Sequence, residues 1–413
     1  MFASLVSVRT LLVAIFVIMA GSGFLSTLVS IRLEAAGTSA FAIGLVAAAY
    51  FAGLTIGSLR VTPLIARVGH IRSFAAFVSI FSASGLAYSI TMTAPFWGIL
   101  RLIDGFMMAG VFVCLESWLN RQASAKTRSS ILAAYMIALY GGQALGQFLL
   151  NLGAERPSLP FVIAAILLSL SVVPVVLTRI DQPRLEYVEP FSLKQLYAAS
   201  PLGVIGVLTT GAILGAFYAL GAVFVQRLGM GIAEVAFFTS CVIGGGVALQ
   251  WPLGLLSDRF DRRAVIVACL LIVLAVSISL ALFAAPDLRL FVLGALFGGF
   301  AFALYPLCVA HSNDHLSEEQ RVGASSGLVL AYSAGAVAGP MIGSAGMQAF
   351  GVQGLFGTIA VIALGGVIFA LWRLIVGKPV EAADQQSFQA LPRTTPMVAM
   401  LEADHEEHVS NDK

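Results

Sequence analysis

The chain has 413 residues, of which 59% are hydrophobic and 11% are charged, whereas about a quarter of the residues of a soluble domain carry a charge. This composition excludes a soluble globular protein and predicts an all-α membrane protein that crosses the bilayer many times. The net charge of +2 says less than the distribution of charge among the loops, and we expect no nucleic-acid partner. The four cysteines all fall inside apolar segments, so we expect buried thiols rather than disulfides.

The first half of the chain contains six apolar segments that we expect to be membrane-spanning helices. The first, from Leu11 to Ile31, has 21 residues without a charge. It is longer than the apolar core of a signal peptide, which predicts a retained helix. The six segments are residues 11–31, 40–59, 73–93, 94–120, 129–154 and 158–178.

The second half repeats this organisation after a polar stretch. Residues 179–200 mix both charge signs with two prolines, and we predict a cytoplasmic linker with a short helix that starts at Ser192. Six further spans are expected at residues 201–226, 235–257, 264–285, 290–311, 322–350 and 351–372. The predicted domains are an N-terminal six-helix bundle (1–178), the linker (179–200), a C-terminal six-helix bundle (201–377) and a polar, net acidic, disordered cytoplasmic tail (378–413).

Twelve transmembrane helices would place both termini on the same side of the membrane. The loops on that side, together with the two ends, hold 18 of the 23 lysines and arginines, and the opposite loops hold four. Arg101 lies within a span. Because positively charged loops remain in the cytoplasm, we expect a multi-pass protein of the bacterial inner membrane with both termini cytoplasmic.

The fourth span, Ala94 to Asn120, is the only long apolar segment with charges well inside it, namely Arg101, Asp104 and Glu116. At about 100° per residue, Asp104 and Glu116 each lie about 60° from Arg101, on either side of it. All three therefore share one face of the helix. Because a charge that faces lipid costs several kcal/mol, this face is expected to line a bundle interior or an aqueous cavity.

Two interpretations remain open for the charged residues of this helix. Arg101 and Asp104, three residues apart, form either a structural ion pair or a pair in which Arg101 contacts substrate or a gate and Asp104 carries a proton. Glu116 either belongs to a cytoplasmic gate or structural ion pair, with Arg128 or Arg72 as its partner, or handles protons or substrate.

Aromatic and amide residues inside the spans are candidates to line the same cavity. Gln143 and Tyr305 are the strongest of these, because both lie toward the middle of spans that would face the charged helix. Together with Arg101, Asp104 and Glu116 they form the predicted site for substrate and proton coupling.

The two halves of the chain resemble each other. Placing Gly105 on Gly299 brings Cys114 onto Cys308. In the fifth span of each half, small residues recur at intervals of four, which allows close approach of helices; they are Ala138, Gly142 and Gly146 in one half and Gly335, Gly339 and Gly343 in the other. A parallel repeat of this kind predicts two pseudo-symmetric six-helix bundles with a substrate site between them near mid-depth.

Three sets of residues resemble motifs of the major facilitator superfamily: Asp258-Arg259 with Arg262-Arg263 after Gly254, Arg101 followed by Gly105, and Gly335 to Gly343 with Gly339-Pro340. Three further segments are similar to the YcaD-like branch of that superfamily: Arg67 to Arg72, Glu116 to Asn120, and Tyr305-Pro306. The resemblance covers about residues 8–376. It implies the superfamily fold, alternating access between the two bundles, and a transporter rather than an enzyme.

The resemblance also implies a conformational latch at the cytoplasmic face. A latch would form ion pairs that exist in one access state and break in the other, whereas the alternative is a cluster of charges that only sets the topology. The predicted cytoplasmic gate consists of Arg67, Arg72, Asp258, Arg259, Arg262 and Arg263.

We therefore expect a secondary active transporter of a small organic solute that is neutral, zwitterionic or amphipathic. No glycine-rich phosphate loop followed by Lys-Ser or Lys-Thr occurs in the sequence, which favours protons as the coupling ion. We expect no cofactor and no metal, since His311 and His315 better fit a solvated loop, and a monomer in contact with membrane lipids. A lipid flippase on the same fold, a drug efflux antiporter, a membrane-embedded enzyme and a sensor without transport remain open as alternatives.

Overall fold

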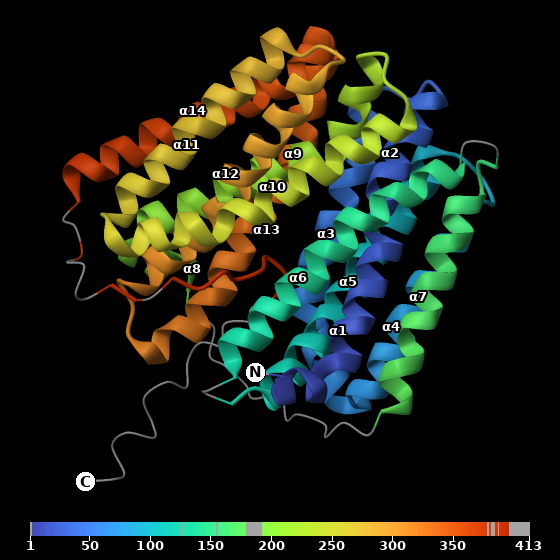
Figure 1. Cartoon of the computed structure of the whole chain (residues 1–413), viewed down its shortest axis with the longest axis horizontal. Helices are drawn as coiled ribbons and strands as arrows, with labels where there is room; N and C mark the ends of the chain where they lie inside the picture. Colours follow the sequence, from blue (N-terminus) through green and yellow to red (C-terminus); the bar gives the residue numbers. More distant parts are fainter. Residues whose placement is uncertain are drawn as a thin grey trace.

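The computed structural model describes residues 2–124, 127–153, 156–178, 192–377, 380, 385–386 and 388–395. Within this part of the chain all regular structure is helical, as the composition predicts. The helices form two bundles that lie close together at one end and diverge toward the other (Figure 1).

The first bundle is formed by helices α1 to α7 and a short 3-10 helix, η1. The first predicted span is split into α1 and α2 by a break at Gly23 and Phe24, and the fifth predicted span continues beyond α6 as η1. The bounds are α1 Phe2–Ser22, α2 Leu25–Ala35, α3 Ala40–Val68, α4 His70–Ala87, α5 Ala94–Gln122, α6 Arg128–Gly146, η1 Gln147–Gly153 and α7 Leu159–Leu177.

The second bundle is formed by α9 to α14 and follows a short helix, α8. The bounds are α8 Leu193–Ala199, α9 Pro201–Arg227, α10 Ile232–Arg259, α11 Arg262–Phe283, α12 Leu288–Asn313, α13 Glu318–Phe350, η2 Gly351–Gln353 and α14 Gly354–Val376. Helix α8 confirms the short helix predicted in the linker. Ser192 caps it, because its hydroxyl accepts the backbone N–H of Gln195 at 3.2 Å while the Gln195 side chain accepts the backbone N–H of Ser192 at 3.3 Å.

Nine helical segments within the described residues are long and apolar enough to cross a bilayer. The first joins α1 and α2, and the last, residues 323–376, joins α13 and α14 through the turn at Gly351. This glycine has a φ of 69°, a left-handed conformation that side chains disfavour. Helices α4 and α6 are not among the nine segments, so the count of twelve spans stays a prediction.

The two bundles repeat the same helix pairings, which confirms their pseudo-symmetry. The pairs α1–α6, α3–α5 and α4–α7 of the first bundle correspond to α9–α13, α10–α12 and α11–α14 of the second. Small residues allow the close pairs to form: a Cβ added at Gly142 would overlap the backbone oxygen of Phe16, and one added at Gly335 would overlap that of Leu208. The predicted repeat of small residues in the fifth span of each half therefore marks one helix contact in both bundles.

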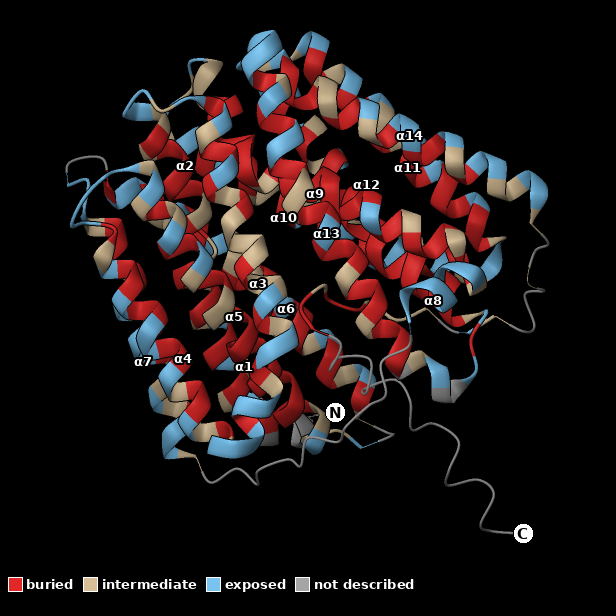
Figure 2. Cartoon of the chain, turned by 180° about the vertical axis from the view of Figure 1, so that it is seen from behind, coloured by how far each residue is buried: buried red, intermediate tan, exposed pale blue. Residues whose placement is uncertain are grey.

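Buried residues lie inside each bundle and between the bundles, whereas exposed residues lie on the outer surfaces (Figure 2). Many of the exposed side chains are large and apolar, for example Leu59, Ile137, Leu170, Leu282 and Ile375. A soluble protein rarely exposes so many large apolar side chains, but a membrane protein presents them to lipid.

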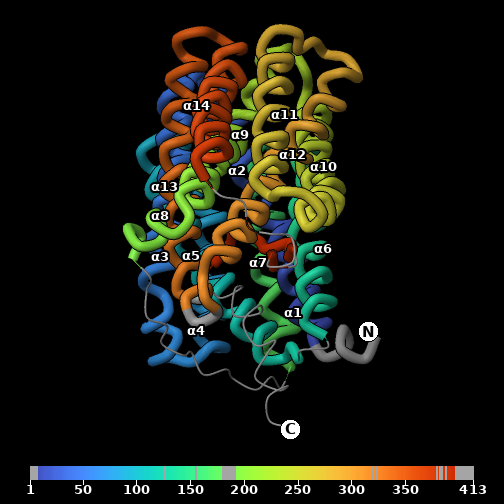
Figure 3. Tube along the Cα trace, turned by 90° about the vertical axis from the view of Figure 1, so that its left-hand side faces the viewer, coloured from blue at the N-terminus to red at the C-terminus, as the bar shows by residue number. Residues whose placement is uncertain are grey.

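We call the end of the molecule at which α1 begins and α5 ends the terminal face. The end at which α2 and α9 end is the opposite face. In the side view, α1 and α4 lie toward the lower end of the molecule, and α2 and α9 lie toward its upper end (Figure 3).

Candidate functional site

Helix α5 holds three charged side chains inside the protein, as the sequence predicts. Arg101 is 2% exposed, and Asp104 and Glu116 are both 0% exposed. The three residues do not form one cluster, however. Glu116 lies about 18 Å farther along α5 than Asp104, toward the terminal face, and it has different neighbours.

Arg101 and Asp104 form an ion pair inside the first bundle. Arg101 Nη1 lies 3.6 Å from Asp104 Oδ2, and Arg101 Nη2 donates a hydrogen bond to the hydroxyl of Ser26 on α2. The guanidinium carbon lies 4.3 Å from the ring centroid of Tyr50 on α3. The hydroxyl of Tyr88 donates to Asp104 Oδ2 at 2.6 Å. The two charges thus compensate each other, with polar partners from the same bundle.

Glu116 is bonded by hydroxyl groups and not by the arginines expected from the sequence. The hydroxyl of Tyr135 on α6 donates to Glu116 Oε1 at 2.7 Å. The hydroxyls of Thr394 and Thr395 donate to Oε1 and Oε2 of the same carboxylate. Within the described residues Glu116 forms no ion pair, so its buried negative charge is balanced by hydrogen bonds alone.

The two threonines belong to a stretch beyond α14 that enters the space between the bundles. This tail segment, residues 388–395, is the red trace that passes between α13 and α6 in Figure 1. Leu391, Thr394 and Thr395 are buried. The prediction of a disordered tail is therefore wrong for this segment, because its contacts are with residues far away in the sequence. The prediction for 378–379, 381–384, 387 and 396–413 lies outside the described residues.

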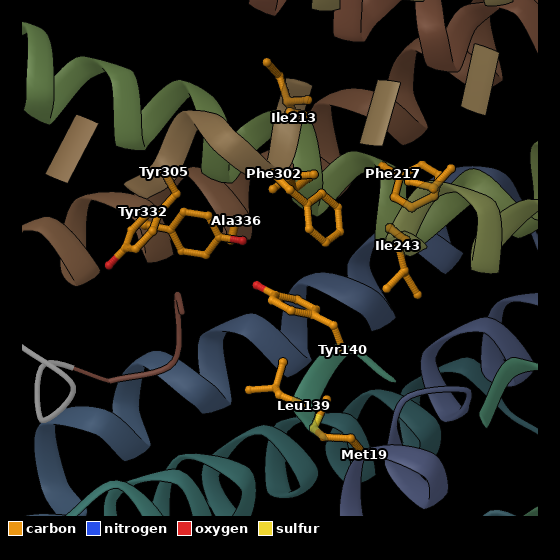
Figure 4. Packing of buried hydrophobic residues seen from close by; sticks show 14 of the residues in the cluster. Met19, Leu139, Tyr140, Ile213, Phe217, Ile243, Phe302, Tyr305, Tyr332 and Ala336 are labelled. Carbon is orange, nitrogen blue, oxygen red and sulfur yellow. The ribbon is translucent and has the colours of Figure 1, made fainter. Parts of the chain in front are cut away.

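Arg393 of the tail segment lies among aromatic rings from both bundles. Its guanidinium carbon is 4.3 Å from the ring centroid of Phe302 on α12, 5.9 Å from that of Tyr140 on α6 and 5.8 Å from that of Tyr332 on α13. We call these three rings the aromatic cage. Figure 4 shows Tyr140 reaching from the first bundle toward the rings of the second. A cation within about 6 Å of a ring centroid is attracted by the face of the ring.

Of the two predicted cavity residues, Tyr305 lies beside the aromatic cage. Its ring centroid is 5.3 Å from that of Tyr332, and it lines a small cavity together with Thr395 of the tail segment. Gln143, on α6, lies against the break between α1 and α2, where a Cβ added at Gly23 would come within 3.0 Å of its side chain.

One buried arginine organises the predicted cytoplasmic gate. Arg262 pairs with Asp258 at 2.9 Å and with Asp314 at 2.7 Å. Its Nη2 also donates to the backbone oxygen of Gln386 at 2.7 Å, and Asp258 accepts the backbone N–H of Phe388 at 2.9 Å. This network ties the start of the tail segment to the terminal-face ends of α10, α11 and α12.

Asp261, which directly precedes α11, and Asp314, which directly follows α12, have shifted pKa values. Burial raises the pKa of Asp261, but hydrogen bonds from the backbone and guanidinium of Arg263 outweigh burial and hold this pKa below its usual value. Burial raises the pKa of Asp314, and the neighbouring Arg262 reduces this effect without reversing it. Asp261 is partly exposed and pairs with the buried Arg263 at 2.8 Å, whereas Asp314 is enclosed with Arg262.

The other predicted gate residues lie on the surface. Arg67, Arg72 and Arg259 are exposed at the ends of α3, α4 and α10. Within the described residues they are not part of the Arg262 network. The structure therefore joins two of the six predicted gate residues, Asp258 and Arg262. Arg263 pairs with Asp261 instead, and the three exposed arginines lie apart.

At the opposite face the two bundles are joined directly. Arg227 at the end of α9 donates two hydrogen bonds to Glu34 at the end of α2, at 2.8 and 3.0 Å. The hydroxyl of Ser30 donates to the backbone oxygen of Ala219 at 2.8 Å. Since these contacts close the opposite half and the tail segment lies between the bundles in the terminal half, the bundles are parted toward the terminal face.

The fold and the position of this site between two pseudo-symmetric bundles agree with one family. Residues 11–249 and 202–402 match the model of the Major Facilitator Superfamily. The chain belongs to the major facilitator superfamily. This superfamily member is a multi-pass membrane protein of a family of transporters that bind small-molecule solutes.

Among its relatives, this superfamily member is 31% identical over 357 residues to the MFS-type transporter YcaD of Salmonella enteritidis PT4. The alignment covers 86% of this chain and 92% of the relative, and YcaD of Salmonella typhi matches to the same extent. The predicted resemblance to the YcaD-like branch is confirmed.

Solved structures share the fold at low sequence identity. The nucleoside transporter NupG has a TM-score of 0.76 and 15% identity, with 90% of this chain and 99% of that chain covered. A bacterial homolog of the human lysosomal transporter Spinster, in an inward-facing and occupied conformation, has a TM-score of 0.76 and 16% identity. The alignment covers 92% of this chain and 98% of that chain. These structures confirm the superfamily fold.

Three features of this superfamily member were missed from the sequence: the tail segment, the aromatic cage and the Glu34–Arg227 pair. The only signal for the tail segment is a short apolar stretch, from Phe388 to Pro392, in a polar tail. The cage and the ion pair join residues from different halves of the chain, and no local pattern indicates them.

A cavity of about 390 Å³ lies elsewhere, at the terminal end of the second bundle, and is lined in part by Ser200, Arg263, His311, His315 and Arg373. His311 is buried and only His315 is exposed, so the expectation of a solvated histidine pair is wrong for His311. Within the described residues no group of three or more potential ligands for a metal ion occurs.

Proposed function

We propose that this protein is a secondary active transporter that moves a small organic solute across the bacterial inner membrane by alternating access, coupled to protons. The observation that carries the proposal is Glu116, a buried carboxylate without an ion-pair partner among the described residues, whose hydrogen-bond partners lie beside an aromatic cage formed by both bundles. A site shared by two bundles is exposed to one side or the other when the bundles rock.

Glu116 is the coupling residue in this proposal. A carboxylate in a closed site takes up a proton and releases it when the site opens to water. Asp104 is the second candidate, because Arg101 already compensates its charge. Gln143 and Tyr305 complete the predicted solute and coupling site.

The moving bodies are the bundles of residues 1–178 and 201–377, connected by the linker 179–200. The terminal face is cytoplasmic, Arg262 with its two carboxylates is the latch on that side, and Glu34 with Arg227 is the gate on the other. The protein acts as a monomer without enzymatic activity.

The proposal is tested in two steps. A thermal-shift screen of the purified protein against metabolites and drugs at two pH values identifies a binding solute, and uptake of that solute into proteoliposomes is then measured under an imposed pH gradient. We expect gradient-driven accumulation by the wild type, its loss in Glu116→Gln, and its retention in Asp104→Asn. Absence of gradient-dependent flux for every binding compound would overturn the proposal, and a lipid translocation assay in the same vesicles separates it from a flippase.

A further inference from the structure

The tail segment brings a cation into the space between the bundles. Arg393 lies over the ring of Phe302, with Tyr140 and Tyr332 as the other members of the aromatic cage. Its Nη1 is buried and makes no hydrogen bond within the described residues. The ring faces, whose π electrons carry partial negative charge, are therefore partners of this guanidinium together with the hydroxyl of Tyr218 on α9, to which it is hydrogen-bonded.

The next two residues of the tail segment connect this cation to a buried carboxylate. Thr394 and Thr395 both donate hydrogen bonds to Glu116. Arg101 does not balance Glu116, because it is paired with Asp104, and Arg121 at the end of α5 is exposed. The fixed charge that the tail segment meets is therefore negative, and the same segment places its own cation, Arg393, in the aromatic cage.

We propose that the aromatic cage and Glu116 form a binding site for a small organic cation of the guanidinium or amidinium class, and that the tail segment occupies this site until such a cation displaces it. The inference rests on the proposed function, whose solute site it specifies. It replaces the neutral, zwitterionic or amphipathic solute expected from the sequence.

The arrangement favours a cation over the other solute classes. An anion would meet the carboxylate of Glu116 and the negative faces of Phe302 and the two tyrosines, which repel it. A neutral solute would displace Arg393 and leave the ring faces of the cage without a cation. A planar cation takes the place of Arg393 against the same rings.

Access to the site requires the tail segment to leave. The opposite face is closed by the Glu34–Arg227 pair. On the terminal side, Leu391 and Thr395 lie against Tyr305 around a small cavity. A solute that arrives from the terminal face therefore competes with the tail segment for the same space.

The experiment compares two probes of equal shape, the benzamidinium cation and neutral benzamide, by calorimetric titration of the full-length protein in nanodiscs. The variant Arg393→Ala removes the internal cation and keeps the rest of the tail segment. The matched control is Arg373→Ala, which removes a cation lying 5.5 Å from the ring of Trp372 on α14, outside the site. We expect Arg393→Ala to bind benzamidinium about tenfold more tightly than the wild type, Arg373→Ala to match the wild type, and benzamide to bind at least about tenfold more weakly than benzamidinium.

Second-site changes in the Arg393→Ala protein test the cage itself. Phe302→Leu keeps an apolar side chain but removes the ring, and Glu116→Gln removes the charge; each is expected to weaken benzamidinium binding about tenfold. Tyr332→Phe keeps the ring and is expected to retain binding, which shows that the background protein is folded.

Equal affinity for benzamidinium and benzamide, or an equal gain in Arg373→Ala, would overturn the cation site. If benzamidinium does not bind while a solute from the panel is still taken up in a Glu116-dependent manner, the cation assignment fails and the transport function stands. If benzamidinium binds as expected but no compound is transported, the transport function fails and the binding site stands.

Discussion

At the residue scale, hydrogen bonds from tyrosine hydroxyls help to offset the cost of burying the two carboxylates of α5. Tyr88 donates to Asp104 at 2.6 Å and Tyr135 donates to Glu116 at 2.7 Å. A buried carboxylate that loses a donor keeps its desolvation cost and loses the compensation for it. The tyrosines are therefore expected to matter for stability as well as for the site.

Tyr88→Phe removes only the hydroxyl that bonds Asp104. We expect it to lower the free energy of unfolding by about 1–3 kcal/mol, because a buried charged acceptor is left with one partner fewer. The measurement is denaturant unfolding in detergent. Tyr197→Phe, at a 44% exposed side chain on α8, is the matched control and is expected to leave the free energy of unfolding unchanged. An equal decrease in both variants would show that the hydrogen bond from Tyr88 to Asp104 does not stabilise the protein.

At the element scale, the closest helix pairs depend on glycine at the contact. A Cβ at Gly335 of α13 would overlap the backbone oxygen of Leu208 on α9, whereas Gly365 of α14 has open space around its Cβ position. A backbone atom cannot move aside as the end of a side chain can. The pair α9–α13 must therefore separate if Gly335 gains a methyl group.

Gly335→Ala is expected to destabilise the protein by about 1–3 kcal/mol through overpacking. Gly365→Ala, the same change where nothing is in the way, is expected to be neutral or to stabilise by up to about 1 kcal/mol. The unfolding temperatures of the two purified variants test this prediction. An equal decrease in unfolding temperature in both variants would show that the loss of glycine flexibility, and not overpacking, is responsible.

The tail segment is held by a few buried side chains, so one substitution should release it. Leu391 is 6% exposed, and Leu391→Gln places an amide in an apolar contact at a cost of about 1–3 kcal/mol. We expect faster trypsin cleavage after Arg393, measured by mass spectrometry with cleavage after the exposed Arg289 as the internal reference. Leu193→Gln, at an exposed leucine of α8, should leave the cleavage rate at Arg393 unchanged. If Leu391→Gln also leaves this rate unchanged, burial of Leu391 does not hold the tail segment in place.

At the scale of the whole molecule, the two bundles are joined at one end and parted at the other. Glu34 and Arg227 hold the joined end with two hydrogen bonds and are about a quarter exposed. A pair that exists only while the opposite face is closed favours that state by its interaction energy. For a partly exposed pair this energy is about 1 kcal/mol.

Glu34→Gln is therefore expected to increase the population that is open at the opposite face about fivefold. Labelling of Ser30→Cys by a membrane-impermeant thiol reagent, in a protein without its native cysteines, reports this opening. The exchanged pair Glu34→Arg with Arg227→Glu should restore slow labelling. Asp287→Asn, which breaks the exposed pair with Arg289, serves as the control, and unchanged labelling in Glu34→Gln would refute the gate.

Much of the architecture was open to prediction. The apolar segments, the short helix capped by Ser192, the small residues of α6 and α13, and the burial of Arg101, Asp104 and Glu116 all follow from composition and spacing within one segment. The boundaries were less accurate where a span is broken, as at Gly23 between α1 and α2. At this break the side chain of Gln147 donates to the backbone oxygen of Gly23 at 3.1 Å, a contact with another element that no pattern in α1 or α2 indicates.

Apolar length and charge placement are local properties, so the amino-acid sequence was sufficient to predict a helical membrane protein with charges inside α5, and short motifs added the resemblance to the major facilitator superfamily. The pairing of Arg101 with Asp104, the contact of Glu116 with the hydroxyls of Thr394 and Thr395, and the position of Arg393 among rings of both bundles became known from the folded molecule. Such contacts join residues as many as 279 positions apart. Their partners are selected by how two bundles and a returning tail pack together, and that information is distributed over the whole chain.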